Sequence, residues 1–307
     1  MSPEESRRDE IERAARAKGW GGLARRGAAA MGDPEVSAPR RGEAAGPPPM
    51  AEWVREDAAR NERPSEPRPP RAPYALPGDV ASEVRRAFIG TAHARERAVD
   101  ELTKAAEAYD RHRYEEALRH ARAVADLVPG VGAVRELAGL AAYRAERWVI
   151  ARSQLRAHFE ITGDAEHLAL VMDAERALRH GRAVERVYEE LLEAEPGADV
   201  LAEARIVLAG AWADERRYPE AIDLLVKAGA AKKLRNPSFR HVRLWYALAD
   251  VYDRAGDTAN ARELFARIVA VEPEAYDAAE RLGEVGHSVR KNRKRRATPA
   301  STKRRDD

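Results

Sequence analysis

The stretch that decides the fold covers residues 242–275 and reads VRLWYALADVYDRAGDTANARELFARIVAVEPEA. Its first half places three large apolar side chains at helical spacing, on one face: Trp245, Leu248 and Tyr252. Gly256 is typical of a helix end, and the small Ala261 allows a second helix to approach the first closely. The stretch therefore predicts a helical hairpin with an apolar side that must be covered by neighbouring hairpins.

The same pattern returns upstream at a similar period. An aromatic residue followed three positions later by alanine occurs at Tyr114/Ala117, Trp148/Ala151 and Tyr218/Ala221. We predict five units, with the residue ranges 98–131, 132–164, 165–199, 202–231 and 242–275. The third unit is the least regular. Val184 takes the place of the small alanine, and the register of this unit could differ by one residue. An unrelated array of antiparallel helices with a similar period is the alternative.

These residues and spacings resemble the tetratricopeptide repeat, a unit of 34 residues that forms two helices. The resemblance implies an all-α fold, a right-handed α-solenoid of about five hairpins with capping helices at both ends. Units two to five also resemble bacterial, high-GC tetratricopeptide-repeat proteins that have disordered N-terminal extensions and no defined activity.

Two further segments are expected to cap the array. Asp79–Arg97 is predicted to be one helix that starts at Asp79 and packs on the first unit through Val80, Val84, Phe88 and Ile89. Tyr276–Val285 is predicted to pack through Ala279 and Leu282 and to leave charged residues in solvent, as the end of a solenoid requires.

The tails differ from the repeats in composition. Twelve of the 18 prolines precede residue 81, so we expect 1–78 to be a disordered Pro/Arg-rich region, 79–286 the solenoid and 287–307 a disordered basic tail. Residues 97–286 carry a net charge of −6, and residues 287–307 carry +7. Such asymmetry usually concerns partners. The tail is also expected to lie against the acidic repeats until a partner displaces it.

Several classes of function are disfavoured. The chain has no cysteine, which removes disulfides and thiol catalysis, and no motif for a phosphate-binding loop or a nucleophile elbow. Its eight histidines include no HExxH and no closely spaced ligand pair. We therefore expect no enzyme activity, no cofactor and no metal. No apolar stretch approaches a membrane span and the first residues are charged, so we expect a cytoplasmic protein without membrane contact.

The resemblance implies that positions 2, 5, 9, 12 and 13 of each first helix line a concave groove. Of the 25 residues at these positions, eight are acidic and four are basic. We expect a protein or peptide partner with Arg or Lys and apolar anchors, although the acidic excess also fits ordinary helix composition. The predicted groove residues are Leu102, Tyr109, Asp110, Glu136, Leu140, Tyr143, Arg144, Asp173, Glu203, Ile206, Asp214, Arg243, Tyr246, Asp250 and Asp253.

The sequence favours a non-enzymatic scaffold that binds a protein or peptide in this groove. The alternative is a nucleic-acid- or ribosome-associated accessory protein that uses the basic tail, where a run of cations could contact phosphates. That run is Arg290, Lys291, Arg293, Lys294, Arg295 and Arg296. It contains no aromatic residue to stack on bases, and a solubilising tail is an equally good interpretation. Oligomeric state does not follow from any of these patterns.

Overall fold

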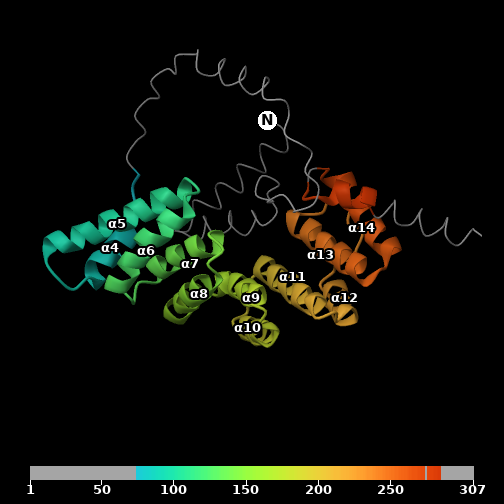
Figure 1. Ribbon diagram of the computed structural model, residues 1–307, viewed down its shortest axis with the longest axis horizontal. Coiled ribbons are helices and arrows are strands. Elements are labelled where there is room, and N and C mark those ends of the chain that lie inside the picture. Colours follow the sequence, from blue (N-terminus) through green and yellow to red (C-terminus); the bar gives the residue numbers. More distant parts are fainter. Residues whose placement is uncertain (1–73, 274, 285–307) are drawn as a thin grey trace, which may run out of the picture. The chain divides into compact units, whose positions relative to one another are not determined.

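The computed structural model describes residues 74–273 and 275–284. From Leu76 onward these residues belong to one compact unit, and they contain helices and no strand (Figure 1). The regions 1–78 and 287–307 lie outside the described ranges, apart from residues 74–78. Their disorder and the limits of the solenoid domain therefore stay predictions.

Five helical hairpins follow one another, as predicted, behind a leading helix α4 (Gly78–Ala87). We call them hairpins one to five and refer to the first and second helix of each. The pairs are α5 (Ala92–Asp110) and α6 (Tyr114–Leu127), α7 (Gly132–Arg144) and α8 (Trp148–Thr162), α9 (Leu168–Ala177) and α10 (Gly181–Glu193), α11 (Ala198–Asp214) and α12 (Tyr218–Lys227), and α13 (Phe239–Ala255) and α14 (Thr258–Val271). A short 3₁₀ turn, η3 (Ala165–His167), precedes α9.

The turn inside each hairpin has the same backbone geometry. One residue in each turn is left-handed, with φ between 57° and 83°: His112, Glu146, Arg179, Arg216 and Gly256. The next amide donates to the carbonyl five residues back, for example Arg113 N to Ala108 O and His180 N to Glu175 O, as in a Schellman motif. This shared geometry fixes the register of hairpin three. Val184 therefore occupies the small-residue position without a slip.

Small residues bring the two helices of a hairpin together. The contact positions on the first helices are Ala105, Gly139, Met172, Ala209 and Ala249, and on the second helices Ala117, Ala151, Val184, Ala221 and Ala261. All ten are buried. In hairpin two the helices α7 and α8 approach each other so closely that a Cβ added to Gly139 would lie 2.5 Å from Leu155 Cδ2. Hairpin three has larger residues, Met172 and Val184, at both positions.

Successive hairpins pack through a regular set of helix contacts. Each second helix packs on the first helix of the next hairpin, from α6 on α7 to α12 on α13. Neighbouring first helices also pack on one another: α5 on α7, α9 on α11 and α11 on α13. The corresponding contact between α7 and α9 is less extensive. The junction between hairpins two and three is therefore the weakest of the four by this measure.

The N-terminal capping segment was predicted to be one helix from Asp79 to Arg97, but in the structure it is divided between two helices. Val80 and Val84 are buried and α4 packs on α5, but the chain leaves the helix at Phe88, which is extended. Ile89 is 95% exposed, so it does not belong to the packed face. A new helix begins after Thr91, whose hydroxyl accepts a hydrogen bond from Ala94 N. This cap competes with continuation of α4.

The C-terminal capping segment is helical over residues 278–284, but its buried face differs from the predicted one. Ala278 and Arg281 are buried, Leu282 is half-buried and Ala279 is exposed. The prediction assumed that arginine faces solvent. Instead the Arg281 guanidinium lies 5.0 Å from the centre of the Phe265 ring, where its charge is paired with two carboxylates described below.

Replacing Gly139 with alanine should destabilise the protein. Leu155 is fully buried and its backbone nitrogen lies only 3.0 Å from the new Cβ, so the helices must move apart. Overpacking of this kind costs about 1–3 kcal/mol, which the urea unfolding midpoint measures. The matched control is Gly130→Ala, where nothing lies within 4 Å of the added Cβ. Equal stability of both variants would show that α7 and α8 tolerate wider spacing.

Candidate functional site

The predicted groove residues of hairpins one and two are mostly core. Five of them are at most 7% exposed: Leu102, Tyr109, Glu136, Leu140 and Tyr143. Only Asp110 is exposed and Arg144 half-buried. Burial removes the five as direct contacts for a partner in this conformation. The positions implied by the family resemblance did not reveal this, because burial depends on how closely the next hairpin approaches.

The predicted residues of hairpins three to five are neither fully buried nor fully exposed, and they lie on the first helices α9, α11 and α13. Asp214 joins all three. It accepts hydrogen bonds from Arg176 Nε and from Arg254 Nη2, each at 2.8 Å. We call the connected charged side chains the first-helix ladder: Asp173, Arg176, Asp214, Asp250, Asp253, Arg254 and Arg281. The ladder holds neighbouring hairpins together and also faces solvent.

The central carboxylate of the ladder, Asp214, stays ionised near neutral pH. Burial acts to raise the pKa of Asp214, but the guanidinium groups of Arg176 and Arg254 outweigh it, and the pKa lies below its ordinary value. At the hairpin-two end, Tyr143 donates to Asp173 Oδ2 at 2.6 Å. Burial and the Asp173 charge raise the pKa of Tyr143, so its hydroxyl remains a donor.

A glycine makes room for the central cation of the ladder. A Cβ on Gly210 of α11 would lie 2.6 Å from Arg176 Nη1, so the guanidinium lies against bare backbone. Gly210 stands at one of the positions that the family resemblance assigns to the groove. Its role is to let a side chain from α9 cross α11 and reach Asp214.

A second ion pair, Glu203 with Arg243, joins α11 to α13 beside the ladder. Its side chains are only 16% and 10% exposed. Burial raises the pKa of Glu203 to about 7, although Arg243 acts in the opposite direction. This carboxyl therefore titrates near neutral pH while the ladder carboxylate Asp214 does not.

The chain's own C-terminal segment covers the predicted residues of hairpin five. Arg281 Nη2 lies 2.8 Å from Asp253 Oδ2 and 3.2 Å from Asp250 Oδ1. Tyr246 donates to Asp277, and its ring centre lies 4.6 Å from that of Tyr276. Three predicted contacts for a partner are thus already engaged.

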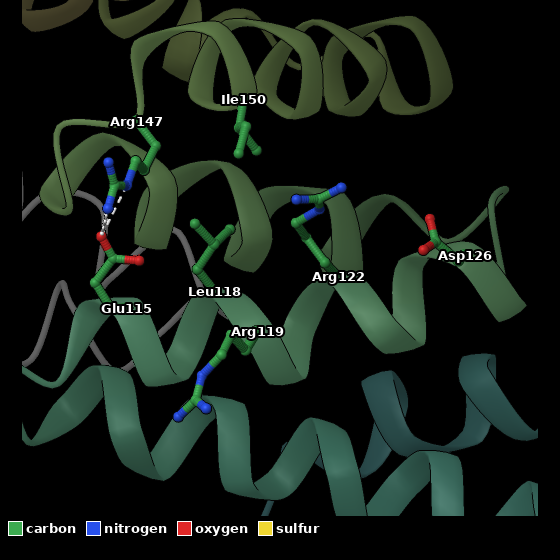
Figure 2. A pocket seen from close by; sticks show the side chains of 7 residues that line it. All are labelled: Glu115, Leu118, Arg119, Arg122, Asp126, Arg147 and Ile150. Carbon is green, nitrogen blue, oxygen red and sulfur yellow. Dashed lines mark hydrogen bonds and ion pairs between the residues drawn. The ribbon is translucent and has the colours of Figure 1, made fainter.

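A separate cleft of about 340 Å³ lies between the second helices α6 and α8 (Figure 2). Arg147 pairs with Glu115 across one end, and Leu118 and Ile150 supply its apolar part. Arg119 and Arg122 also line it, and neither has an ion-pair partner among the described residues. None of the predicted groove residues belongs to this cleft.

One cluster of possible metal ligands was missed by the sequence analysis. Glu136, His158 and His167 lie together and are buried. They come from three elements and follow no spacing motif, so no local signal identified them. By contrast, His112 and His180 lie in the turns inside hairpins one and three. The six cations Arg290–Arg296 lie outside the described residues, and so does any contact of the tail with the repeats.

Comparison with known proteins supports the repeat assignment. The family model described as tetratricopeptide repeat matches residues 242–285. Among similar solved structures is the crystal structure of the TPR domain of P58(IPK), with 12% identity, coverage of 66% of this chain and 68% of that chain, and a TM-score of 0.29. A search of curated proteins gives no match. In the described part of the chain, no helix is long and apolar enough to cross a membrane.

The raised pKa of Glu203 predicts a specific pH dependence of stability. A carboxyl with a folded-state pKa near 7, above its unfolded value, stabilises the fold at low pH and loses that contribution as pH rises through 7. From pH 5 to pH 8, wild type should lose about 2 kcal/mol relative to Glu203→Gln, measured by urea unfolding at both values. Asp223→Asn, on the exposed side of α12, is the control. A pH-independent difference between wild type and Glu203→Gln would contradict the assigned pKa.

Proposed function

We propose that this chain, a tetratricopeptide-repeat protein, is a non-enzymatic scaffold that binds a protein or peptide through the first-helix face of hairpins three to five. Tetratricopeptide repeats in general mediate contacts between proteins, and stacked helical repeats offer extended surfaces for them. The proposal places the contact on α9, α11 and α13, where the predicted groove residues are half-exposed.

The first-helix ladder is the observation that carries this proposal. Its central carboxylate, Asp214, has a side chain that is 23% exposed, and Arg176 and Arg254 are 31% and 30% exposed. Ion pairs at this depth contribute little net stability, so a partner's charged group can exchange with one member at small cost. Ile206, half-buried on the same helix α11, offers an apolar anchor beside them.

The net charge of the ladder determines which partner chemistry we expect. Four carboxylates and three guanidinium groups belong to it, so one negative charge remains in excess. Without Arg281 the excess would be two negative charges, and Arg281 from the capping segment neutralises one of them. The ladder therefore favours a partner with Arg or Lys near an apolar side chain, with affinity that falls as salt increases.

Binding of labelled peptides tests the proposal. The probes alternate Arg or Lys with Leu or Phe, and their counterparts carry Asp or Glu instead. We expect saturable binding of basic peptides to full-length protein in fluorescence anisotropy, at least about tenfold tighter than the acidic counterparts. Raising the salt concentration should weaken the binding.

A matched pair of double variants locates the surface within one hairpin. Ile206→Ala/Asp214→Asn changes α11, and Ile222→Ala/Asp223→Asn makes the same chemical change on α12. Both isoleucines pack against the same core. The α11 variant should lose at least about tenfold in affinity, and the α12 variant about twofold or less. Absence of saturable binding, or an equal loss in both variants with helicity retained, would overturn the proposal.

A further inference from the structure

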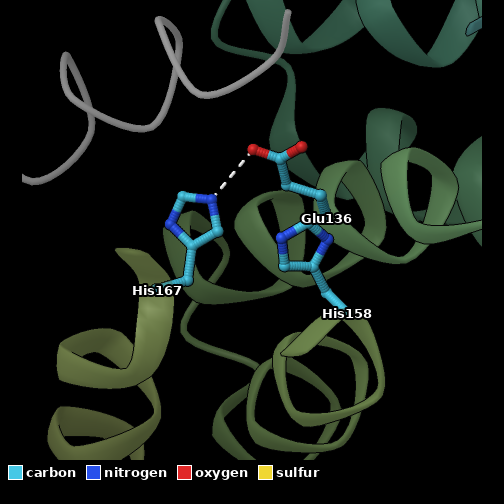
Figure 3. Close-up of side chains that lie close together, drawn as sticks. All are labelled: Glu136, His158 and His167. Carbon is cyan, nitrogen blue, oxygen red and sulfur yellow. Dashed lines mark hydrogen bonds and ion pairs between the residues drawn. The ribbon is translucent and has the colours of Figure 1, made fainter. Parts of the chain in front are cut away.

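We propose that Glu136, His158 and His167 form a binding site for a divalent transition metal, with zinc as the preferred ion, at the junction of hairpins two and three (Figure 3). One ligand atom from each residue lies within 4.8 Å of the other two. All three residues are at most 6% exposed. The proposal is independent of partner binding on the first-helix ladder.

Three different elements bring the side chains together. Glu136 lies on α7 and His158 near the end of α8, while His167 closes the 3₁₀ turn η3. Between the histidines the chain reverses. Helix α8 ends at the left-handed Gly163, and the Asp164 carboxylate then accepts a hydrogen bond from Glu166 N at 2.9 Å. This capped turn sets His167 against His158, with ring centres 5.4 Å apart.

The hydrogen bond of His158 leaves one ring nitrogen available. Its Nδ1 lies 3.0 Å from the backbone carbonyl oxygen of Gly132. A carbonyl can only accept, so Nδ1 carries the proton, and in the neutral ring Nε2 keeps its lone pair. No other hydrogen bond to this ring is found among the described residues. Metal-bound histidines commonly donate their second ring nitrogen to a carbonyl in this way.

The charge at the site is incomplete without a cation. The Glu136 carboxylate has His167 Nε2 at 2.8 Å from its Oε1 and no Lys or Arg partner in the described ranges. A buried carboxylate is costly unless a positive charge or strong hydrogen bonds compensate it. Either a protonated His167 or a divalent ion supplies that charge, and only the ion also uses the free nitrogen of His158.

The ligand set selects the class of metal. Two imidazole nitrogens and one carboxylate oxygen suit Zn²⁺, Co²⁺ and Ni²⁺, whereas Ca²⁺ and Mg²⁺ require oxygen ligands. Tetrahedral zinc with bonds of about 2.1 Å sets its ligand atoms about 3.4 Å apart. The distance of 2.8 Å between His167 Nε2 and Glu136 Oε1 would therefore widen slightly, and the longer ligand distances, which are at most 4.8 Å, would shorten. Water would complete the coordination.

The position of the site indicates what a bound ion would do. It would join α7 and α8 to the turn before α9, across the junction where the first helices pack least. Hairpin three also departs most from the small-residue pattern, through Met172 and Val184. The ion would therefore act as a structural link between hairpins.

Metal titration of full-length protein without an affinity tag tests the proposal. After chelator treatment, Zn²⁺ is added in calorimetry and Co²⁺ in visible absorption. We expect one tightly bound ion per chain and the intense absorption of tetrahedral Co²⁺. Glu136→Gln and His167→Gln keep hydrogen-bonding groups but remove a ligand. Each should weaken binding by more than about 100-fold, because even outer-shell changes cost 10–100-fold.

The matched control is a histidine–glutamate pair that belongs to no group of three ligands. His120 Nδ1 lies 2.7 Å from Glu101 Oε2, and both side chains are partly exposed. His120→Gln and Glu101→Gln should keep full affinity. Zn²⁺ should raise the melting temperature of wild type and of these controls, but not that of Glu136→Gln or His167→Gln.

Two results would overturn the proposal. The first is a folded wild-type protein with no saturable binding of Zn²⁺, Co²⁺ or Ni²⁺. The second is unchanged affinity in Glu136→Gln and His167→Gln. Either would leave the cluster as a buried hydrogen-bonded pair of His167 and Glu136. If a variant does not fold, NMR of the wild-type imidazole nitrogens decides the question. Zn²⁺ must shift the signals of His158 and His167, and unchanged signals would count equally against the site.

Discussion

In four of the five hairpins the structure depends on the close approach of two helices at one small residue on each. Gly139 against Leu155 shows the constraint most directly, because not even a methyl group fits. Two helices in such contact make a flat hairpin with apolar side chains on its outer faces. Trp245 and Phe265, almost fully buried, need a neighbouring hairpin to cover that surface. Stacking is therefore a consequence of the hairpin, and each hairpin relies on its immediate neighbours.

Stacking gives the polar residues of the first helices two tasks. Arg176 and Asp214 connect successive hairpins and also form part of the exposed face. Their half-exposed pairs contribute modestly to stability, whereas the more buried Glu203–Arg243 pair carries a desolvation cost that shows in the raised pKa of Glu203. In the proposed binding mode, binding and cohesion between hairpins would be coupled. A partner that takes Asp214 from Arg176 would also change the contact of α9 with α11.

The sequence predicted what depends on local spacing. The turns recur in every hairpin and the small contact positions in four of the five, so Tyr114, Trp148 and Tyr218 were enough to place hairpins one, two and four. The candidate site was predicted less well. Whether Tyr143 faces solvent depends on a hydrogen bond to Asp173, 30 residues away. Likewise, the sequence alone suggests that Arg281 faces solvent, whereas in the structure it pairs with two carboxylates of α13. Such pairings depend on which side chains the neighbouring hairpin presents, and they do not recur at the repeat period of the sequence.

The junction of hairpins two and three shows where a repeat pattern stops being informative. A common pattern describes what all units share, and the Glu136–His158–His167 cluster exists because this junction departs from it. Hairpin two ends in Thr162-Gly163-Asp164 where units one, three and five have proline, and this ending leads into the 3₁₀ turn that carries His167. The next hairpin has the shortest first helix, α9, and carries Met172 and Val184 at the contact positions. In a repeat protein, specific chemistry is therefore to be sought at the least regular unit, where selection for uniform packing leaves the fewest constraints.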